Sequence, residues 1–193
     1  MKVYLTGWDG FLARKLRETD AHEWTDNINE ADVIFFLGSP TFTESKITRC
    51  RGLAMHDYVQ QISDMIWHTN IPVIFASTTG VDDIELDHSG STVYNLCKLY
   101  IENYIMHNSE DYLILRIGTI ISDKKSDIDM MKPDRIQPRL LRGEFKDIPK
   151  EDEYLHVDTF VSQTNEAINN INNSIFEYDL EHHSMFDLIK MAK

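Results

Sequence analysis

The segment KVYLTGWDGFLA, residues 2–13, decides the fold, because a β-rich run passes through a glycine turn directly into a helical pattern. Residues 2–6 are typical of a short strand, and the helical pattern extends from Phe11 to about Glu18. Glycine at such a turn lets the backbone approach a pyrophosphate, and the helix N-terminus then faces the phosphate charge. Many strand–turn–helix units bind no nucleotide, so the turn alone leaves both readings open.

Strand-like and helix-like segments alternate along the chain, which predicts an α/β fold with a parallel sheet and helices on both faces. The run VIFFL at 33–37 is continuously apolar, as expected for a strand that is covered on both sides. We expect a surface loop at 124–132 and a polar turn at 149–153. The other expected elements are strands at 72–76, 112–116, 154–157 and 174–178, and helices at 53–69, 92–108, 136–141, 159–170 and 185–192.

Length and charge limit the class of protein. The 193 residues suffice for one domain with a sizeable core, and the formal net charge is −13, from 19 Lys+Arg against 32 Asp+Glu. That charge repels nucleic acid and anionic membranes, and the dense basic stretch of Arg135, Arg139 and Arg142 is small. We therefore expect neither as a partner. No apolar run is long enough to span a bilayer, and the opening breaks at Gly7, so we expect a cytoplasmic protein.

Cysteine and histidine give no sign of a metal site. Cys50 and Cys97 are too few for a disulfide framework or a zinc site, and they are expected to be reduced thiols. His182 and His183 are adjacent, but a metal would need further ligands from elsewhere in the chain. We expect both histidines at the surface and no bound metal.

Tyr94 and Lys98 carry the second chemical signal. Four residues apart in a predicted helix, they share one face, and a nearby ammonium favours the phenolate and lowers the tyrosine pKa from its usual value near 10. Such a tyrosine can act as a general base at neutral pH. The pair follows a predicted strand that ends in Ser77-Thr78-Thr79, where a hydroxyl could bind the same substrate oxygen. A lone YxxxK is frequent by chance, so its context decides.

Asp26 bears on the choice of cofactor. It lies about 20 residues after the first glycine, where an acid would bind an adenosine ribose, although a solvated loop residue is an equal alternative. No Arg or Lys occurs from Asp20 through Ser45, so a 2′-phosphate would meet an acid and no neighbouring cation. We expect NAD in preference to NADP.

Together these segments resemble the extended short-chain dehydrogenase/reductases, the NAD-dependent epimerase/dehydratase family. Thr6-Gly7-x-x-Gly10-Phe11-Leu12-Ala13 is similar to its TGxxGFxG turn, and residues 74–78 with Val81 resemble its active-site strand and turn. Thr78, Tyr94 and Lys98 match its catalytic residues. Further similarity covers Glu102, Leu115-Arg116, and residues 140–144, 154–158 and 184–189, in the family's order.

The resemblance implies a Rossmann-like dinucleotide-binding domain over residues 1–120 and a reduced substrate-binding region over 121–193, in one compact unit. Tyr94 would remove or return a hydroxyl proton, Lys98 would also bind the nicotinamide ribose, and Thr78 would position the substrate oxygen. The implied cofactor-binding residues are Gly7, Trp8, Asp9, Gly10, Phe11, Leu12, Asp26, Leu37, Gly38, Ser39, Tyr94 and Lys98. The implied substrate-binding residues are Thr119, Arg139 and Arg142, although the arginines could instead pair with Asp134 and Glu144.

The chain departs from the family pattern in places. Only residues 27–30 separate Asp26 from the next strand, which leaves no room for the usual third strand and helix, one wall of the adenine pocket. Trp8 and Asp9 are bulky and acidic where the turn usually has small residues. Thr119 replaces an asparagine of many nucleotide-sugar members.

The leading interpretation is an NAD(P)-dependent epimerase/dehydratase acting on a nucleotide sugar by hydride transfer. A dinucleotide-binding sensor or scaffold without turnover is the alternative, and a carbonyl reductase for a small non-sugar substrate is a third. The sequence does not choose among epimerase, dehydratase, decarboxylase and reductase. The resemblance also suggests a homodimer through the helices at 53–69 and 92–108, although the protein's own chain could bury these helices.

Overall fold

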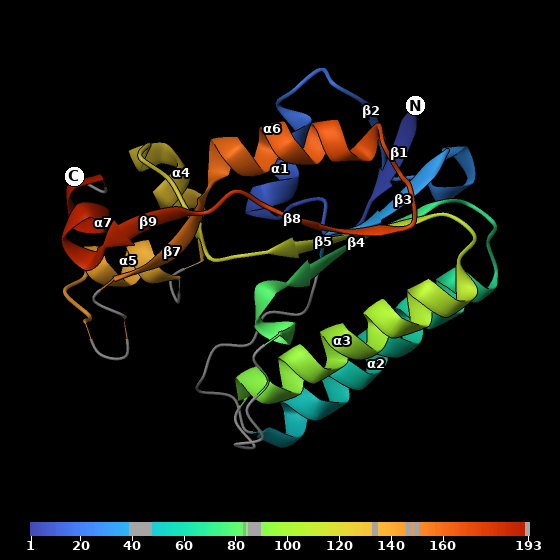
Figure 1. The fold of residues 1–193 in the computed structure, drawn as a ribbon, viewed down its shortest axis with the longest axis horizontal. Coiled ribbons are helices and arrows are strands. Elements are labelled where there is room, and N and C mark those ends of the chain that lie inside the picture. The colour runs from blue at the N-terminus through green and yellow to red at the C-terminus, as the bar shows by residue number, and fades with distance from the viewer. Residues whose placement is uncertain are drawn as a thin grey trace.

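A parallel six-stranded sheet forms the centre of the molecule (Figure 1). The computed structural model describes residues 1–38, 48–82, 84, 90–132, 135–145, 148 and 151–191, with only the backbone described at 48–55, 90–91 and 151. The sheet order is β2-β1-β3-β4-β5-β8, and every neighbouring pair is parallel. Its strands are β1 (Lys2–Leu5), β2 (Glu23–Thr25), β3 (Val33–Phe36), β4 (Val73–Thr78), β5 (Tyr112–Ile117) and β8 (Ser174–Glu177).

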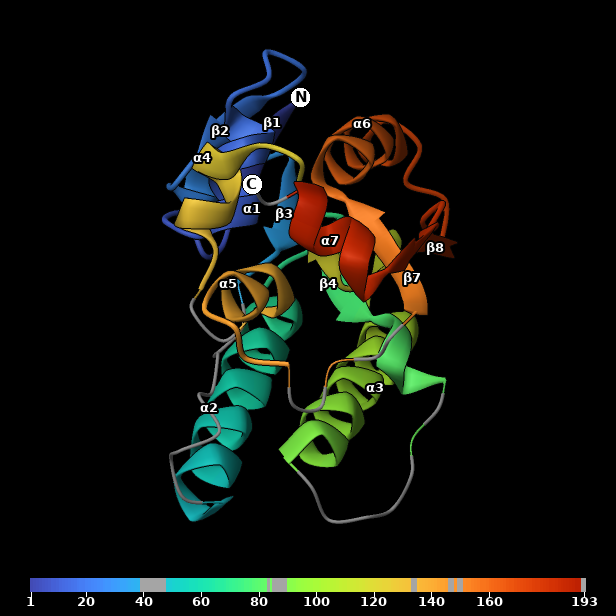
Figure 2. The ribbon, with the colours of Figure 1, turned by 90° about the vertical axis from the view of Figure 1, so that its left-hand side faces the viewer.

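Helices cover both faces of this sheet, as Figures 1 and 2 show. On one face lie α1 (Phe11–Arg17) and α6 (Val157–Ile168), and on the other lie α2 (Thr48–Trp67) and α3 (Gly90–Asn108). In β3, Val33 and Phe35 belong to the core on the α1 side, whereas Ile34 and Phe36 belong to the core on the α2 side. Both faces of the strand are buried, which explains its unbroken apolar sequence. The predicted α/β class is confirmed.

The chain passes from β2 to β3 with only one short 3₁₀ helix, η1 (Ile28–Glu30), between them. The prediction that a further strand and helix are missing here is confirmed, because β2 is the edge of the sheet. The side chain of Asn27 caps η1 by accepting a hydrogen bond from the Asn29 N–H at 3.2 Å. The edge strand therefore ends at Thr25 beside a tight, capped turn.

The C-terminal part of the chain builds a small lobe, at the left of Figure 1. It consists of a second sheet, in the order β6-β7-β9, and three short helices. Ile121, Leu140, Ile148, Tyr154 and Leu188 form its buried core. In contrast, α6 and β8 come from the same part of the sequence but belong to the central layers: β8 is a strand of the central sheet, and α6 packs on its core. The lobe's elements are β6 (Ile120–Ile121), α4 (Lys125–Met130), α5 (Ile136–Leu141), β7 (Glu151–His156), β9 (Glu181–Ser184) and α7 (Met185–Met191).

The expected surface loop at 124–132 is wrong. Residues 125–130 of this segment form α4, in which Asp127 is 1% and Ile128 2% exposed. The Asp127 carboxylate accepts hydrogen bonds from Lys15 Nζ of α1 at 3.1 Å and from Ser122 Oγ at 3.0 Å. The Asp127 carboxylate can be buried because Lys15, distant in sequence, and Ser122, five residues before it, satisfy it with hydrogen bonds.

The remaining elements agree with the sequence in type and differ mainly at their ends. The expected polar turn at 149–153 is wrong for residues 151–153, which extend β7 because β9 pairs with them; residues 149 and 150 lie outside the described part. β6 and β9 were not expected, and α2 begins five residues earlier than predicted. Short polar strands such as β9 carry no apolar alternation, so only their pairing defines them.

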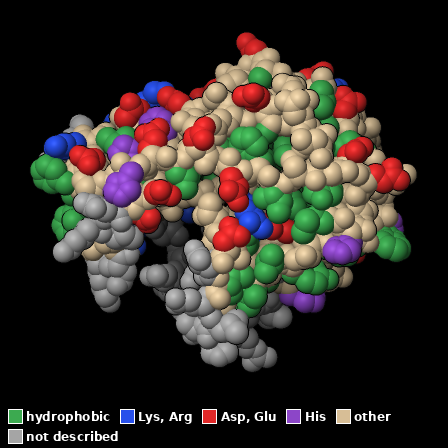
Figure 3. Space-filling model, in the orientation of Figure 1, with side chains coloured by type: hydrophobic (Ala, Val, Ile, Leu, Met, Phe, Trp, Pro, Cys, Tyr) green, Lys and Arg blue, Asp and Glu red, His purple; other side chains and the backbone are tan. Residues whose placement is uncertain are grey.

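The surface agrees with the acidic composition. Acidic side chains are scattered over the face drawn in Figure 3, where basic ones are few. Of the helices that the structure describes, none is long and apolar enough to cross a membrane.

Candidate active site at the carboxyl ends of β1, β3 and β4

The glycine turn after β1 touches the end of β3 through bare backbone. Gly7 has φ +71°, and a Cβ placed on it would lie 2.5 Å from the Cα of Gly38. The Gly38 N–H donates to the backbone oxygen and to Oγ1 of Thr6, both at 3.1 Å, and the Gly10 N–H donates to the Gly7 carbonyl at 2.8 Å. Side chains at Gly7 or Gly38 would force the two strand ends apart.

The bulky residues of the turn are accommodated beside it. Trp8 is half-buried and packs against the core on the α1 side, where the Arg17 guanidinium lies 4.0 Å from the centre of its ring. Arg17 also donates to the Trp8 carbonyl at 3.1 Å. Leu12 and Leu37 pack against the same core, Phe11 is half-buried, and Asp9 and Gly10 are exposed. The large side chain of Trp8 thus packs to one side and leaves the backbone of the glycine turn uncovered.

Asp26 is exposed directly after β2, at the edge of the sheet. β2 pairs in parallel with β1, with Thr25 opposite Tyr4, so Asp26 lies at the same carboxyl edge as the glycine turn. Ser39, the remaining expected cofactor residue, lies outside the described residues.

Lys98 is buried in the core between α3, α2 and β4. It is 1% exposed, and its Nζ donates to the Ala76 carbonyl at 2.6 Å and to the Tyr58 hydroxyl at 3.4 Å. Aromatic rings surround the ammonium: Nζ lies 4.6 Å from the ring centre of Phe75, 5.3 Å from that of Tyr58 and 5.5 Å from that of Tyr94. Burial lowers the pKa of Lys98 to about 7. The negative charge of Glu102, one helical turn away, acts in the opposite direction and raises this pKa.

Tyr94 lies on α3, and Thr78 lies at the end of β4, on which α3 packs. Tyr94 is half-buried and packs against the core beneath α3. Thr78 is the last residue of β4, and its Oγ1 accepts a hydrogen bond from the Gly80 N–H at 3.3 Å. α3 also packs on this turn, because a Cβ on Gly80 would lie 2.7 Å from Nδ2 of Asn95. Tyr94 and Lys98 of α3 and Thr78 of β4 therefore lie on two elements that pack against each other.

Tyr58 is the member of this site that sequence reasoning missed. It is 9% exposed on α2, and burial raises the pKa of its phenol above the usual value. Only the packing of α2 against α3 brings its hydroxyl to Lys98, forty residues away in sequence. No local pattern distinguishes it from an ordinary core tyrosine.

The expected substrate residues lie in or near the small lobe. Thr119 joins β5 to β6, and its carbonyl accepts from the Leu155 N–H at 2.9 Å. Arg142 makes a two-pronged ion pair with Glu144, at 2.7 and 3.1 Å, and Arg139 lies 3.8 Å from the same carboxylate. The pairing with Glu144 is therefore present, whereas Asp134 lies outside the described residues.

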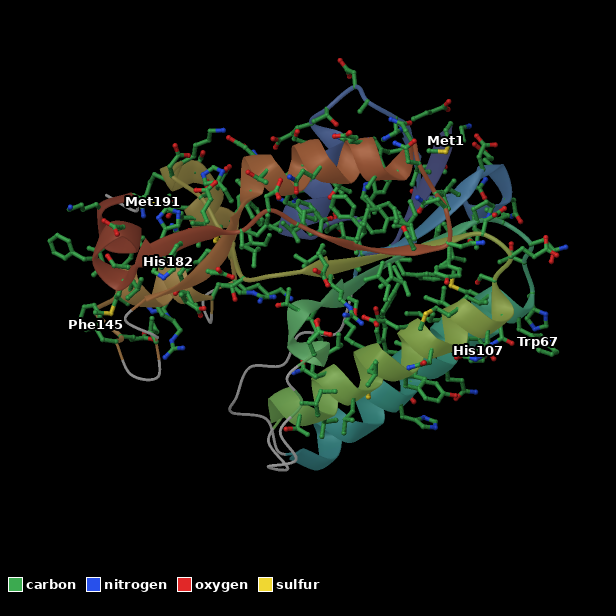
Figure 4. All side chains as sticks on the ribbon, in the orientation of Figure 1. Met1, Trp67, His107, Phe145, His182 and Met191 are labelled. Carbon is green, nitrogen blue, oxygen red and sulfur yellow. The ribbon has the colours of Figure 1, made fainter. Side chains whose placement is uncertain are left out.

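The two adjacent histidines belong to β9, in the small lobe. In Figure 4, His182 lies in the small lobe, at the opposite end from Trp67 and His107 on α2 and α3. His183 contacts Glu181 at 3.1 Å. Within the part of the chain that the structure describes, no group of three or more His, Cys, Asp and Glu side chains is arranged to hold a metal.

Two of the cavities on the described surface differ in chemistry. One of about 330 Å³ lies at the glycine turn, between the strand ends and α2, and is lined by Thr6, Gly7, Phe36, Gly38, Tyr58, Gln61, Ile62 and Met65. The other, of about 450 Å³, lies between α6 and the segment that follows β8 and carries three acids, Asp158, Asp179 and Glu181. Only the first borders the glycine turn and the Tyr58 partner of Lys98.

The buried lysine predicts a pH-dependent stability. The folded chain loses the Lys98 proton near pH 7, whereas the unfolded chain keeps it to about pH 10.5, so wild-type stability should rise with pH between these values. Lys98→Met lacks this gain. The difference in unfolding free energy between wild type and variant should therefore shift by about 2 kcal/mol in favour of wild type from pH 7 to pH 9. Denaturant titrations at both pH values measure it.

Exposed Lys125 supplies the control for this measurement, because Lys125→Met should show no comparable pH dependence. A difference between wild type and Lys98→Met that stays constant from pH 7 to pH 9 would contradict the assignment.

Comparison with known proteins shows the fold. No protein-family model and no curated protein match the chain. Solved structures do match over 98% of it. UDP-glucuronic acid 4-epimerase from Bacillus cereus, in complex with NAD, has a TM-score of 0.70 and 16% identity, with 81% of that chain covered.

Two further structures have the same architecture. The NAD-dependent NDP-hexosamine 5,6-dehydratase TunA, of tunicamycin biosynthesis, has a TM-score of 0.72, with 13% identity and 79% of that chain covered. dTDP-4-dehydrorhamnose reductase from Bacillus anthracis str. Ames, in complex with NADP, has a TM-score of 0.71, also with 13% identity and 79% covered. Each match covers 98% of the present chain. The chain therefore has the Rossmann-like fold of these structures.

Proposed function

We propose that the protein is an NAD(P)-dependent oxidoreductase of the epimerase/dehydratase kind, acting on a nucleotide sugar. The observation that carries the proposal is the meeting of α3 with the end of β4. There Lys98 bonds to the Ala76 carbonyl, Asn95 packs on Gly80, and Tyr94 and Thr78 lie on the two elements so joined. Structural neighbours that process sugar nucleotides with NAD or NADP support the same chemistry.

The residues at the carboxyl edge fit a dinucleotide. At Gly7, Gly10 and Gly38 the backbone bears no side chain, and Gly10 caps α1 without a side-chain hydrogen bond, so the first N–H groups of the helix keep their donor capacity. In our proposal these groups hold the pyrophosphate, and Asp26 accepts from the adenosine ribose. The other cofactor contacts we propose are Trp8, Asp9, Phe11, Leu12, Leu37, Ser39, Tyr94 and Lys98.

Tyr94 is the proposed acid and base. Its phenol takes a proton from the substrate hydroxyl and returns it, while the Thr78 hydroxyl hydrogen-bonds the same oxygen. Lys98, when charged, stabilises the phenolate and binds the nicotinamide ribose. The bound nicotinamide supplies the hydride acceptor and donor. Thr119, Arg139 and Arg142 are proposed substrate contacts on the side of the small lobe.

A dinucleotide-binding sensor without turnover is the second candidate. The absence of a further strand and helix beyond β2 favours this candidate, because the nucleotide-binding edge of the sheet is shorter without them. A buried lysine next to a tyrosine argues for turnover, since a pure binding module gains nothing from this costly placement.

Four variants separate the two candidates. In the enzyme, Tyr94→Phe should lower turnover roughly 10²–10⁴-fold with cofactor affinity nearly intact, because the ring stays and the proton-transfer group goes. Thr78→Val should lower turnover in the same way, and Lys98→Ala should weaken both turnover and cofactor binding. Gly7→Val should abolish cofactor binding, since a side chain there collides with Gly38. Calorimetric titration and hydride-transfer absorbance measure the two properties.

Tyr112→Phe serves as the matched control, because Tyr112 is a half-buried tyrosine at the opposite end of the sheet. An active Tyr94→Phe protein would refute the mechanism. A protein in which only Gly7→Val has any effect is the sensor.

Asp26 sets the expected cofactor preference. A 2′-phosphate beside this carboxylate is repelled, so NAD should bind at least about tenfold more tightly than NADP. Asp26→Asn should reduce the ratio of the two affinities, whereas Asp20→Asn, at another exposed aspartate, should leave it unchanged. Titration of both dinucleotides tests this, and tighter binding of NADP by wild type would overturn it.

We also propose a homodimer through α2 and α3. Ile101 and Ile105 face the sheet and are fully buried, yet α3 also exposes Leu96 at 43% and Tyr100 at 55% on its outer side. Tyr100 stacks on Tyr104, so the outer face of the helix is apolar too. A second copy would cover it.

Sedimentation at micromolar concentration should give twice the chain mass. Tyr100→Arg should yield monomers, whereas Phe145→Arg, which changes an exposed aromatic residue in the small lobe, should not (Figure 4). A monomeric wild type excludes the dimer.

A further inference from the structure

Glu102 is a fully buried carboxylate on α3, one helical turn beyond Lys98. It accepts two hydrogen bonds from Arg116 of β5, Nε to Oε1 at 3.3 Å and Nη2 to Oε2 at 2.9 Å. The third nitrogen of the same guanidinium, Nη1, donates to Oδ1 of Asp82 at 2.7 Å. Asp82 directly follows η2 (Thr79–Val81), the turn after Thr78. One side chain therefore joins α3, β5 and this turn.

The geometry suits arginine and no other cation. A planar guanidinium can hold one carboxylate with two prongs and a second with its remaining nitrogen, whereas an ammonium cannot match this fork. Arg116 is 13% exposed in its side chain, and hydrogen bonding to Glu102 raises its pKa further. Glu102 without Arg116 would be a buried carboxylate lacking its counter-ion, which is costly.

We propose that Arg116 is a positioning residue, which fastens the turn after Thr78 to α3 by bridging Asp82 and Glu102. The bridge fixes the end of β4, and with it Thr78, relative to the helix that carries Tyr94. Its catalytic meaning rests on the proposed function, but the bridge itself is a property of the free protein. Neither Arg116 nor Glu102 needs to touch a substrate.

The bridge also bears on Lys98. The groups that face the ammonium are Tyr58 from α2, Tyr94 and Glu102 from α3, and the Ala76 carbonyl from β4. Arg116 forms an ion pair with Glu102, and its positive charge offsets part of the negative charge that Lys98 experiences. Without Arg116, the negative charge of Glu102 acts on Lys98 without this compensation. When Glu102 is neutralised, Lys98 loses the attraction of that charge.

Hydrogen exchange tests the mechanical half of the proposal. The Gly80 N–H donates to Thr78 Oγ1 at 3.3 Å, and the Asp82 N–H donates to the Thr79 carbonyl at 3.2 Å. In Asp82→Asn and Arg116→Gln these amides should exchange roughly tenfold faster, as expected for the loss of one hydrogen bond to a charged group. Arg116→Lys should be intermediate, and Lys125→Gln should match wild type.

If Arg116→Gln fails to fold, Asp82→Asn and Arg116→Lys still decide, because Asp82 is exposed and lysine keeps the charge. Exchange at wild-type rates in both of these variants would overturn the proposal.

Titration of the Lys98 side chain by NMR, assigned with Lys98→Met, tests the electrostatic half. Arg116→Gln should raise the Lys98 pKa by about 1, and Glu102→Gln should lower it. Asp82→Asn should leave it unchanged, because Asp82 meets only the outer nitrogen of Arg116. If the role of Arg116 were purely structural, Arg116→Gln and Glu102→Gln would not shift the Lys98 pKa in opposite directions. Shifts of the Lys98 pKa with the same sign in both variants, or no shift in either, would contradict the bridge.

Neither measurement uses cofactor or substrate, so the two proposals fail separately. If both measurements agree with the bridge but wild type binds no NAD or NADP, the proposed function fails alone. If Tyr94→Phe loses turnover while Asp82→Asn and Arg116→Lys exchange like wild type, the bridge fails alone.

Discussion

The bare backbone contact between Gly7 and Gly38 is the constraint on which this architecture depends. It brings the segments after β1 and β3 together at the carboxyl edge of the sheet, because neither residue has a Cβ and Gly7 adopts a left-handed φ. The chain then leaves β1 into α1 on one face, and α2 covers the other (Figure 2). The cavity at the carboxyl edge, lined by both glycines, is a direct consequence of this contact.

A second feature conflicts with simple stability. Lys98 occupies a core position among aromatic rings, where burial lowers its pKa to about 7 and two polar contacts only partly compensate. An apolar residue would pack there at lower cost. Conflicts of this kind concentrate at functional sites, and this one lies beside Tyr94, at the end of β4.

Much of the fold could be read from the sequence, because the central strands are continuously apolar and the long helices show a regular period. The absence of a strand beyond β2 followed from the four residues available there. The small lobe could not be read in this way. α4 is rich in charged residues, and the hydrogen bonds of Asp127 to Lys15 of α1 and to Ser122, just after β6, explain why this carboxylate is buried. Likewise, the catalytic candidates came from spacing and resemblance, whereas Tyr58 and the Asp82 end of the Arg116 bridge depend on tertiary packing alone.

The central claim is that the edge formed by β1, β3 and β4 binds a nicotinamide dinucleotide. Backbone NMR of the whole chain during titration with NAD tests it most directly. The account predicts saturable shifts at the amides of Gly7, Gly10, Gly38 and Thr78. Absence of shifts at these glycines, or saturable shifts confined to the acidic cavity between α6 and Glu181, would contradict it.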